Sequence, residues 1–187
     1  MPEQIPPARE LGVERLGALL RTLSVLRGRF TLASGRTSEY YIDCRKTTLH
    51  PEGGNLVARS ILALIDREGL RPGAVGGMTM GADPIATAVA ILSWQEGRPI
   101  PAFLVRKEAR EHGTARRVEG WLPAGSEVLV VEDVVTTGRS TLEAIAAVHE
   151  ASARVAAVVA LIDREEGGRE ALAKFRFFSF FRARDLL

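Results

Sequence analysis

Residues 128–141 constrain the fold and chemistry of this chain more than any other segment. Four apolar residues at 128–131 predict a buried strand, and two adjacent carboxylates, Glu132 and Asp133, follow at its end. A turn of small hydroxyl residues and one glycine then leads into a predicted helix. Carboxylates accept hydrogen bonds from vicinal ribose hydroxyls, and free N–H groups at a helix start bind phosphate. This order suits a sugar phosphate; the alternative is an ordinary strand–turn–helix joint.

The predicted elements alternate through the middle of the chain. Helices are expected over 51–68, 83–95 and 139–150, and strands at 74–76, 102–105, 128–131 and 155–162. The strands are apolar along their whole length, so both their faces are buried. This indicates an α/β fold with a doubly wound, mostly parallel sheet flanked by helices. Ligands bind such sheets at the carboxyl ends of the strands, where the acidic pair, Gly76-Gly77 and Asp163-Arg164 all lie.

The two ends of the chain do not fit this alternation. Before it we expect a helix over about 8–25 and short strands at 30–32 and 40–43, and after it comes a phenylalanine-rich tail at 175–181. We expect one domain over 1–187. Its predicted parts are a small hood lobe at about 1–48, a core at about 49–165, and a tail that packs on the core or hood.

Composition excludes several classes of function. A chain of 187 residues can bury a sizeable core, and a formal net charge of +2 is too small to argue for a nucleic-acid partner. The single cysteine, Cys44, excludes an internal disulfide and argues against a cysteine-based metal site. Residues 1–10 lack the apolar core of a secretory leader, and no apolar stretch is long enough to span a bilayer. We therefore expect a cytoplasmic protein with no membrane partner.

A long connection at 106–124 precedes the acidic-pair strand. Its first part, 106–117, carries five basic and two acidic residues, a local charge of +3. Connections of this length are usually functional or disordered. A cationic loop beside a sugar-phosphate pocket would neutralise a departing pyrophosphate and exclude water as it closes. The alternative is a solvated charged loop, and the position just before the acidic pair favours the functional interpretation.

Three segments carry a resemblance to a known family. The strand, acidic pair and Thr-Thr-Gly turn at 128–138 resemble the phosphoribosyl pyrophosphate (PRPP) motif of type I phosphoribosyltransferases. Arg-Lys-Glu-Ala-x-x-His-Gly at 106–113 resembles the catalytic loop of the orotate phosphoribosyltransferases. Phe-x-Leu-x-Ser-Gly-x-x-Ser-x-Tyr at 30–40 resembles the N-terminal signature of the same family. With Asp163-Arg164, these landmarks fall in the family's order and span most of the chain.

The resemblance implies a pentosyl transfer. Ribose 5-phosphate would pass from PRPP to N1 of orotate, giving orotidine 5′-monophosphate and pyrophosphate in pyrimidine nucleotide biosynthesis. The implied cofactor is Mg²⁺, held mainly by PRPP and water and at most through Glu132 and Asp133. The family also implies a homodimer in which the loop of each subunit reaches the neighbouring site. No protein nucleophile is needed, and the chain contains no Gly-x-Ser-x-Gly motif.

The resemblance also implies roles for individual residues. Catalysis falls to Lys107, His112 and Asp133; the charge of Glu132 and Asp133 would favour an oxocarbenium-like transition state. The implied PRPP-binding residues are Arg106, Lys107, Arg110, His112, Glu132, Asp133, Val134, Val135, Thr136, Thr137, Gly138, Arg139, Ser140 and Thr141. The implied orotate-binding residues are Thr136, Arg164, Tyr40 and Tyr41. For Arg164 the alternative is an ion pair with Asp163 or Glu165.

The glycine-rich turn at 76–84 matches the family's pyrophosphate loop, although a tight structural turn explains it nearly as well. The chain departs from the family pattern at three positions. Met80 and Ala33 stand where lysine occurs in family members, and Arg110 replaces a common loop lysine, so the role of Arg110 is open.

Two other functions remain as alternatives. One is a purine phosphoribosyltransferase, against which the Arg-Lys-Glu loop argues. The other is a regulator that senses PRPP without catalysis. Such a regulator would be expected to lack Lys107 and His112, which are present here.

Overall fold

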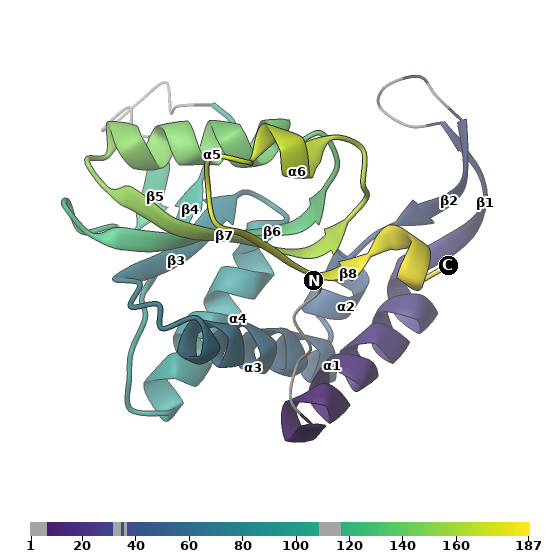
Figure 1. The fold of residues 1–187 in the computed structure, drawn as a ribbon, viewed down its shortest axis with the longest axis horizontal. Helices are drawn as coiled ribbons and strands as arrows, with labels where there is room; N and C mark the ends of the chain where they lie inside the picture. Colours follow the sequence, from purple (N-terminus) through teal and green to yellow (C-terminus); the bar gives the residue numbers. More distant parts are fainter. Residues whose placement is uncertain (1–6, 32–34, 36, 109–116) are drawn as a thin grey trace.

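The computed structural model describes residues 7–31, 35, 37–108 and 117–187, with side chains described from residue 12 onward. Its centre is a six-stranded sheet in the order β5-β4-β3-β6-β7-β8 (Figure 1). Five neighbouring strands are parallel: β4 (Ala102–Val105), β3 (Ala74–Met78), β6 (Glu127–Val135), β7 (Arg154–Asp163) and β8 (Phe177–Arg182). The edge strand β5 (Val118–Gly120) is antiparallel to β4. The predicted doubly wound α/β fold is confirmed.

Helices cover both faces of the sheet. Helices α3 (Pro51–Arg67) and α4 (Ala82–Gln95) lie on one face, and α5 (Arg139–Glu150) and α6 (Gly168–Ala171) lie on the other (Figure 1). Helix α3 begins with proline at its first turn, where no backbone donor is lost, and Gly69 follows its end at φ +64°. Within the described ranges, no helix is long and apolar enough to cross a membrane.

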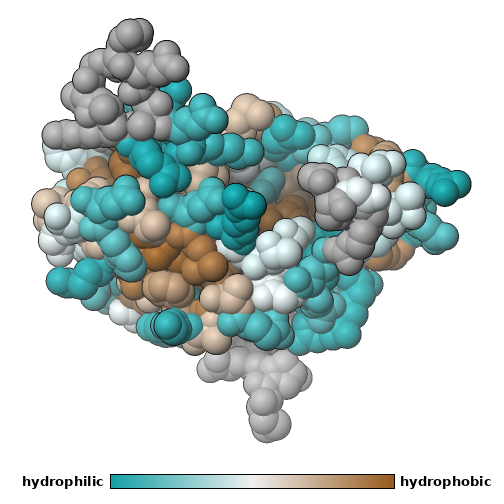
Figure 2. Space-filling model, turned by 90° about the horizontal axis from the view of Figure 1, so that it is seen from above, coloured by the Kyte–Doolittle hydropathy of each residue, from teal (hydrophilic) through white to brown (hydrophobic). Residues whose placement is uncertain are grey.

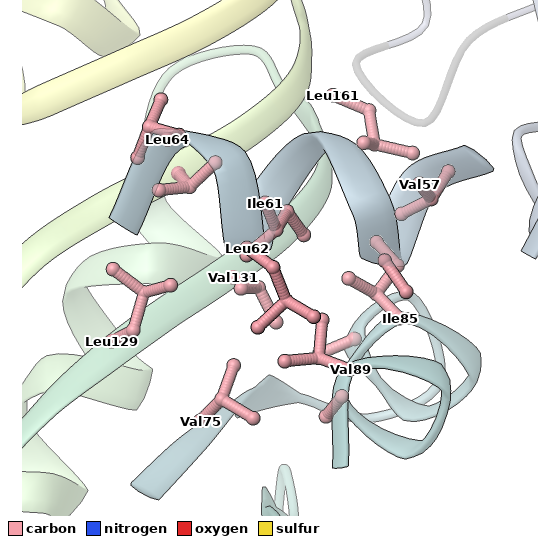
Figure 3. Packing of buried hydrophobic residues seen from close by; sticks show 14 of the residues in the cluster. Val57, Ile61, Leu62, Leu64, Val75, Ile85, Val89, Leu129, Val131 and Leu161 are labelled. Carbon is pink, nitrogen blue, oxygen red and sulfur yellow. The ribbon is translucent and has the colours of Figure 1, made fainter. Parts of the chain in front are cut away.

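The larger core lies between the sheet and α3 and α4 (Figure 3). Apolar residues recur on α3 at a spacing of three or four, which places them on one face of the helix. They meet apolar residues of α4 and of three neighbouring strands. The labelled members of this cluster are Val57, Ile61, Leu62, Leu64, Val75, Ile85, Val89, Leu129, Val131 and Leu161.

The N-terminal region forms the part beside this core. Helix α1 (Pro7–Leu19) continues into a π-helix, η1 (Leu20–Ser24). Strands β1 (Val25–Thr31) and β2 (Thr37–Ile42) then pair with each other in a separate two-stranded antiparallel sheet (Figure 1). The short helix α2 (Arg45–Thr48) leads back to the core. The predicted helix over 8–25 is therefore two helical segments that end where β1 begins.

The tail was expected to pack on the core or on the hood lobe. It contacts both the main sheet and the N-terminal region. Strand β8 pairs in parallel with β7 at the edge of the main sheet. The turn η2 (Ala183–Asp185) follows it. Arg21 then donates a hydrogen bond of 3.3 Å to the carbonyl of Asp185, and Arg27 of β1 donates to the carbonyl of Leu187. The chain end therefore bridges the main sheet and β1.

Strands β6 and β5 of the main sheet also differ from the sequence prediction. Strand β6 continues to Val135, beyond the predicted end at 131, because Glu132 and Val135 remain in register with Ala160 and Asp163 of β7. Strand β5 lies within the segment predicted as an irregular connection; three residues are too few to show a periodic pattern. Viewed from the side of α5 and α6, hydrophilic residues cover much of the surface, with a smaller hydrophobic area (Figure 2).

Candidate active site

Two neighbouring carboxylates, the buried Glu132 and the partly buried Asp133, lie near the carboxyl end of β6. Burial, followed by the charge of Asp133, raises the pKa of Glu132 to about 8. The hydroxyl of Thr141 donates to Glu132 Oε2 over 3.1 Å. Burial also raises the pKa of Asp133, whose Oδ1 accepts a 2.8 Å bond from the Val134 N–H. Two buried acids with so few partners are suited to receive donors or positive charge from a ligand.

The turn after the pair carries hydroxyl groups into the start of α5. Gly138 precedes the helix at φ +78°, a conformation that favours glycine. Thr137 and Ser140 are exposed and Thr136 is half-buried. Val135 is buried in the core beneath α5, so only its backbone is available to the site.

Arg139 is directed away from this turn along α5. Its guanidinium forms a 3.0 Å ion pair with Glu143, one helical turn further on. Its side chain is 86% exposed, so the pair holds it on the outer surface. The structure thus brings together the acids and hydroxyls of the predicted PRPP residues and directs the Arg139 side chain away from them.

The glycine-rich turn between β3 and α4 lies against Asp133. A Cβ at Gly81 would lie 2.5 Å from Asp133 Oδ1, and one at Gly77 would lie 2.1 Å from the Val131 carbonyl oxygen. Both contacts are closer than any side chain allows. Within the turn, the Thr79 hydroxyl donates to Asp83 Oδ2 over 2.7 Å. The turn at 79–83 therefore has its backbone next to the acidic pair, which a larger residue would prevent.

A cavity of about 530 Å³ opens on the other side of this turn. It is lined by Thr79, Met80, Leu104, Arg106, Lys107, Glu108 and Glu119. The Arg106 Nε is buried and has no hydrogen-bond partner among the described residues. The ends of the basic loop are joined, because the Arg106 N–H donates to the Arg117 carbonyl over 2.8 Å. Arg110, His112 and Ala33 lie outside the described residues.

Arg164, directly after β7, faces Tyr40 of β2. The Arg164 guanidinium carbon lies 5.3 Å from the centre of the Tyr40 ring. Its Nη2 pairs with Glu166 at 2.8 Å, and its Nε is buried without a hydrogen-bond partner in the described part of the chain. Tyr41 is 38% exposed and packs beside Phe30 with ring centres 5.8 Å apart.

The alternative pairing of Arg164 with Asp163 or Glu165 is not the one observed. The carboxylate of Asp163 lies 3.3 Å from Arg169, and that of Glu165 lies 3.3 Å from Arg184. The Arg164 N–H also donates to the Val135 carbonyl over 2.9 Å, which ties it to the end of β6. Tyr40 and Arg164 therefore form one wall of the same strand-end region as the acidic pair.

Sequence reasoning missed two supports of the site. A Cβ at Gly168, the first residue of α6, would lie 2.6 Å from the Thr136 carbonyl oxygen, so α6 packs directly on the hydroxyl turn. The Cys44 thiol lies 3.9 Å from the Asp133 carbonyl, which brings the end of the N-terminal region to the acidic pair. The Gly167-Gly168 pair is a turn signal, but no sequence pattern indicates what it packs against.

Comparison with known proteins gives the class of this site. Residues 50–180 match the model of the phosphoribosyl transferase domain family. The orotate phosphoribosyltransferase of Aquifex aeolicus is 45% identical over 160 residues, covering 84% of this chain and 86% of that protein. That of Mycobacterium avium is 46% identical over 160 residues, covering 86% and 87%. The chain belongs to the orotate phosphoribosyltransferase family, and the family predicted from its sequence motifs is confirmed.

Solved structures agree with this assignment. Orotate phosphoribosyltransferase of Mycobacterium tuberculosis in complex with Fe(III) dicitrate superposes with a TM-score of 0.83 at 42% identity. The same protein in complex with PRPP gives 0.78 at 40% identity; both comparisons cover 94% of this chain and 98% of theirs. Adenine phosphoribosyltransferase of Leishmania donovani, at 17% identity and a TM-score of 0.62, shares the fold alone.

Proposed function

We propose that this protein is an enzyme that transfers ribose 5-phosphate from PRPP to N1 of orotate. Orotidine 5′-monophosphate and pyrophosphate are the products. The observation that carries the proposal is the buried acidic pair, Glu132 and Asp133, with the hydroxyl turn on one side and the glycine-rich turn on the other. Each part suits a different portion of PRPP: the sugar, the 5′-phosphate and the pyrophosphate.

The acidic pair binds the ribose. Its two carboxylates accept hydrogen bonds from the 2′- and 3′-hydroxyls, and such donors favour the ionised acids over the protonated Glu132 of the free protein. Their negative charge then stabilises the positive charge that develops on the sugar as its bond to pyrophosphate breaks. Asp133 is the catalytic member of the pair.

The turn into α5 binds the 5′-phosphate. Backbone N–H groups at a helix start attract a dianion, and the nearby hydroxyls add further donors. The residues proposed for this subsite are Val134, Val135, Thr136, Thr137, Gly138, Arg139, Ser140 and Thr141. Because Arg139 pairs with Glu143 and the Val135 side chain is buried, these two residues act through their backbone groups.

The basic loop and the glycine-rich turn bind the pyrophosphate. Arg106 has a buried Nε that lacks a partner among the described residues, and it lines the same cavity as Lys107 and the turn. Lys107 and His112 neutralise the charge of the leaving group, with Arg110 as a further contact. The Met80 side chain has no donor, so the turn contributes its backbone N–H groups instead.

Orotate binds between Arg164 and the hood. The unpartnered Arg164 Nε supplies a donor for a planar, anionic base, and Tyr40 provides an aromatic surface beside it. Thr136 and Tyr41 complete the proposed subsite. In this arrangement N1 of orotate approaches the ribose carbon from the side opposite the pyrophosphate.

Mg²⁺ is the proposed cofactor, and its fit depends on the acidic pair. Glu132 and Asp133 offer carboxylate oxygens, which Mg²⁺ prefers, and Mg²⁺ retains water and substrate oxygens. In the part of the chain that the structure describes, no group of three or more potential ligand side chains is present. When bound, the ion would neutralise pyrophosphate charge. The cytoplasmic location and the division into hood lobe and core stay predictions.

A substrate panel tests the proposal. The protein is incubated with PRPP and Mg²⁺ and with orotate, uracil, adenine or hypoxanthine in turn, and pyrophosphate release is followed. We expect release with orotate alone. Release with a purine instead would support the purine alternative. Tight PRPP binding without release with any base would identify a PRPP-sensing regulator.

The proposed homodimer shares its loops between two sites, and subunit mixing tests this. Lys107→Ala removes the charge that meets pyrophosphate late in the reaction, so turnover should fall far more than PRPP affinity. An inactive Lys107→Ala subunit mixed with an inactive Asp133→Asn subunit should regain activity, because hybrid dimers hold one site with both groups intact. Mixtures that stay inactive after proven subunit exchange would place each loop in its own chain's site.

A further inference from the structure

Glu166 is an acidic residue of the candidate site to which the proposed function gives no role. It lies in the turn between β7 and α6. Its Oε1 lies 2.8 Å from Nη2 of Arg164, and the side chains of Glu166 and Arg164 are 24% and 10% exposed. An ion pair shielded from water in this way is weak evidence of stability, but it can hold its partners in one geometry. The pair therefore bears on where the Arg164 guanidinium lies.

The Arg164 residue is held at more than one point. The guanidinium carbon lies 5.3 Å from the centre of the Tyr40 ring, so the ring supports one face of the group. The Glu166 carboxylate holds Nη2, and the Arg164 backbone N–H donates to the Val135 carbonyl over 2.9 Å. A guanidinium has five donors in a fixed plane, and the buried Nε has no partner among the described residues. With Nη2 and one face held, this Nε is a donor of fixed position.

The turn that carries Glu166 has its own backbone supports. Glu165 adopts φ +57°, a left-handed conformation that is uncommon outside glycine, and its N–H donates to Asp163 Oδ1 over 2.8 Å. The other carboxylate oxygen of the buried Asp163 lies 3.3 Å from Arg169. These contacts hold the turn through Asp163. Loss of the Glu166 side chain should therefore leave the turn folded and act on the Arg164 guanidinium.

The two adjacent acids of this turn have different partners. Glu165 pairs at 3.3 Å with Arg184 of η2, and both of these side chains are exposed. Glu166 pairs with the more buried Arg164. An exposed pair contributes little, whereas a charge-assisted hydrogen bond to a buried guanidinium fixes its orientation. Glu165 therefore provides a matched control, because it carries the same charge one residue away and contacts the tail instead.

We propose that Glu166 is a positioning residue for the base, which holds the Arg164 guanidinium against Tyr40 so that its Nε is in place before orotate binds. The inference rests on the orotate subsite of the proposed function. Glu166 acts through Arg164 and not on the base itself. A long, flexible side chain loses rotamer freedom when it binds a ligand, so holding it beforehand lowers the cost of binding. PRPP is proposed to bind at other elements, so the effect of Glu166 should be confined to the base.

Steady-state kinetics of Glu166 variants test this role. Glu166→Ala should raise KM for orotate about tenfold, the effect of losing a hydrogen bond to a charged group. Its kcat and its KM for PRPP should change less than about twofold, because only binding of the base is weakened. Glu166→Gln keeps an acceptor for Nη2 and should show a smaller rise, whereas the control Glu165→Gln should match wild type. Circular dichroism confirms that each variant is folded.

A double-mutant cycle shows whether Glu166 acts through Arg164. In an Arg164→Ala background, Glu166→Ala should cause no further loss of kcat/KM for orotate, because its partner is already absent. A further loss as large as in the wild-type background would overturn the inference.

The remaining outcomes separate this inference from the proposed function. A folded Glu166→Ala protein with wild-type KM for orotate overturns the inference and leaves the proposed function intact. Orotate binding is also measured by isothermal titration calorimetry. A wild-type protein that binds orotate, and binds it more weakly as Glu166→Ala, but releases no pyrophosphate would support the positioning role and refute the proposed function alone.

Discussion

Two neighbouring strand–turn–helix units of this molecule share a plan and differ in content. In the β6–α5 unit two acids lie near the end of the strand, the turn holds hydroxyls, and the outer face of the helix carries charged residues such as Arg139 and Glu143. In the β3–α4 unit the strand glycines lie against neighbouring backbone, Gly81 of the turn lies against the Asp133 carboxylate, and the exposed positions of the helix are uncharged. One unit presents acids and hydroxyls at the strand end, and the other presents close backbone approach and an uncharged outer helix face.

The difference in residue content follows from the face of the sheet that each helix covers. Both turns lie at the carboxyl ends of adjacent parallel strands, so both border the region where the proposed function places the ligand. The helices then leave on opposite faces of the sheet, and hydrophilic residues cover much of the α5 face (Figures 1 and 2). The following predictions test whether the β6–α5 unit contributes reactive groups and the β3–α4 unit contributes close backbone packing.

The largest effect on turnover is expected from Asp133→Asn, near the carboxyl end of β6. Removing this charge should lower turnover about 10²-fold or more, because it stabilises the developing charge on the ribose. The fold should persist, since the neutral amide removes the desolvation cost that burial imposes on the Asp133 carboxylate. Steady-state kinetics and circular dichroism provide the two measurements. An unfolded variant would show that Asp133 is a structural residue.

Gly81→Ala tests the role of shape in the β3 turn. The new Cβ would lie 2.5 Å from Asp133 Oδ1, so either the turn or the carboxylate must move. We expect KM for PRPP to rise about tenfold and stability to fall by about 1–3 kcal/mol. Gly12→Ala is the control, because a Cβ there has no neighbour within 4 Å. Unchanged kinetics for Gly81→Ala would show that the turn between β3 and α4 does not contribute to PRPP binding.

The pH dependence of stability tests the protonation state of Glu132, near the carboxyl end of β6. Because the pKa of Glu132 is raised to about 8, the folded protein retains a proton that the unfolded chain releases at lower pH. Stability of the free protein should therefore fall as pH rises from about 4.5 to 8, and the melting temperature should follow. Glu132→Gln should flatten this slope, whereas exposed Glu143→Gln should leave it. A slope unaffected by Glu132→Gln would contradict the assignment.

The smallest effect is expected on the outer face of α5. Glu143→Ala breaks the exposed i,i+4 pair with Arg139, which should cost at most about 0.5 kcal/mol. Turnover should stay at the wild-type level, because this pair lies outside the turn. Chemical denaturation and steady-state rates measure the two quantities. A large loss of activity would show that the outer face of α5, and not only the turn before it, contributes to the reaction.

Strong periodicity and motifs made much of the fold predictable. The strand at 102–105 and the helix at 139–150 match the structure residue for residue, because their apolar patterns end at clear turn signals. Strand β6 was predicted too short, since two acids ordinarily end a buried strand. Pairing with β7 keeps them in the ladder, and that tertiary contact has no local signal.

In the candidate site, too, the features encoded by local sequence were predictable and those set by tertiary contacts were not. The acidic pair and hydroxyl turn are contiguous in sequence, so their order alone indicated a sugar-phosphate site. The approach of Gly81 to Asp133 joins residues 52 positions apart, and the contact of Gly168 with the Thr136 carbonyl depends on how α6 folds back. The partner of Arg164 is Glu166 rather than an adjacent acid, a choice made by side-chain packing that spacing does not encode.

The last five residues tether the N-terminal helical segment and β1 to the main sheet. Strand β8 is held in the main sheet, and within a few residues the chain end is bonded to Arg21 and Arg27. The short length of this link limits how far β1 and β2 can swing from the strand ends where the base would bind. Lengthening it would let β1 and β2 move further from the strand ends without altering any residue proposed to bind a substrate.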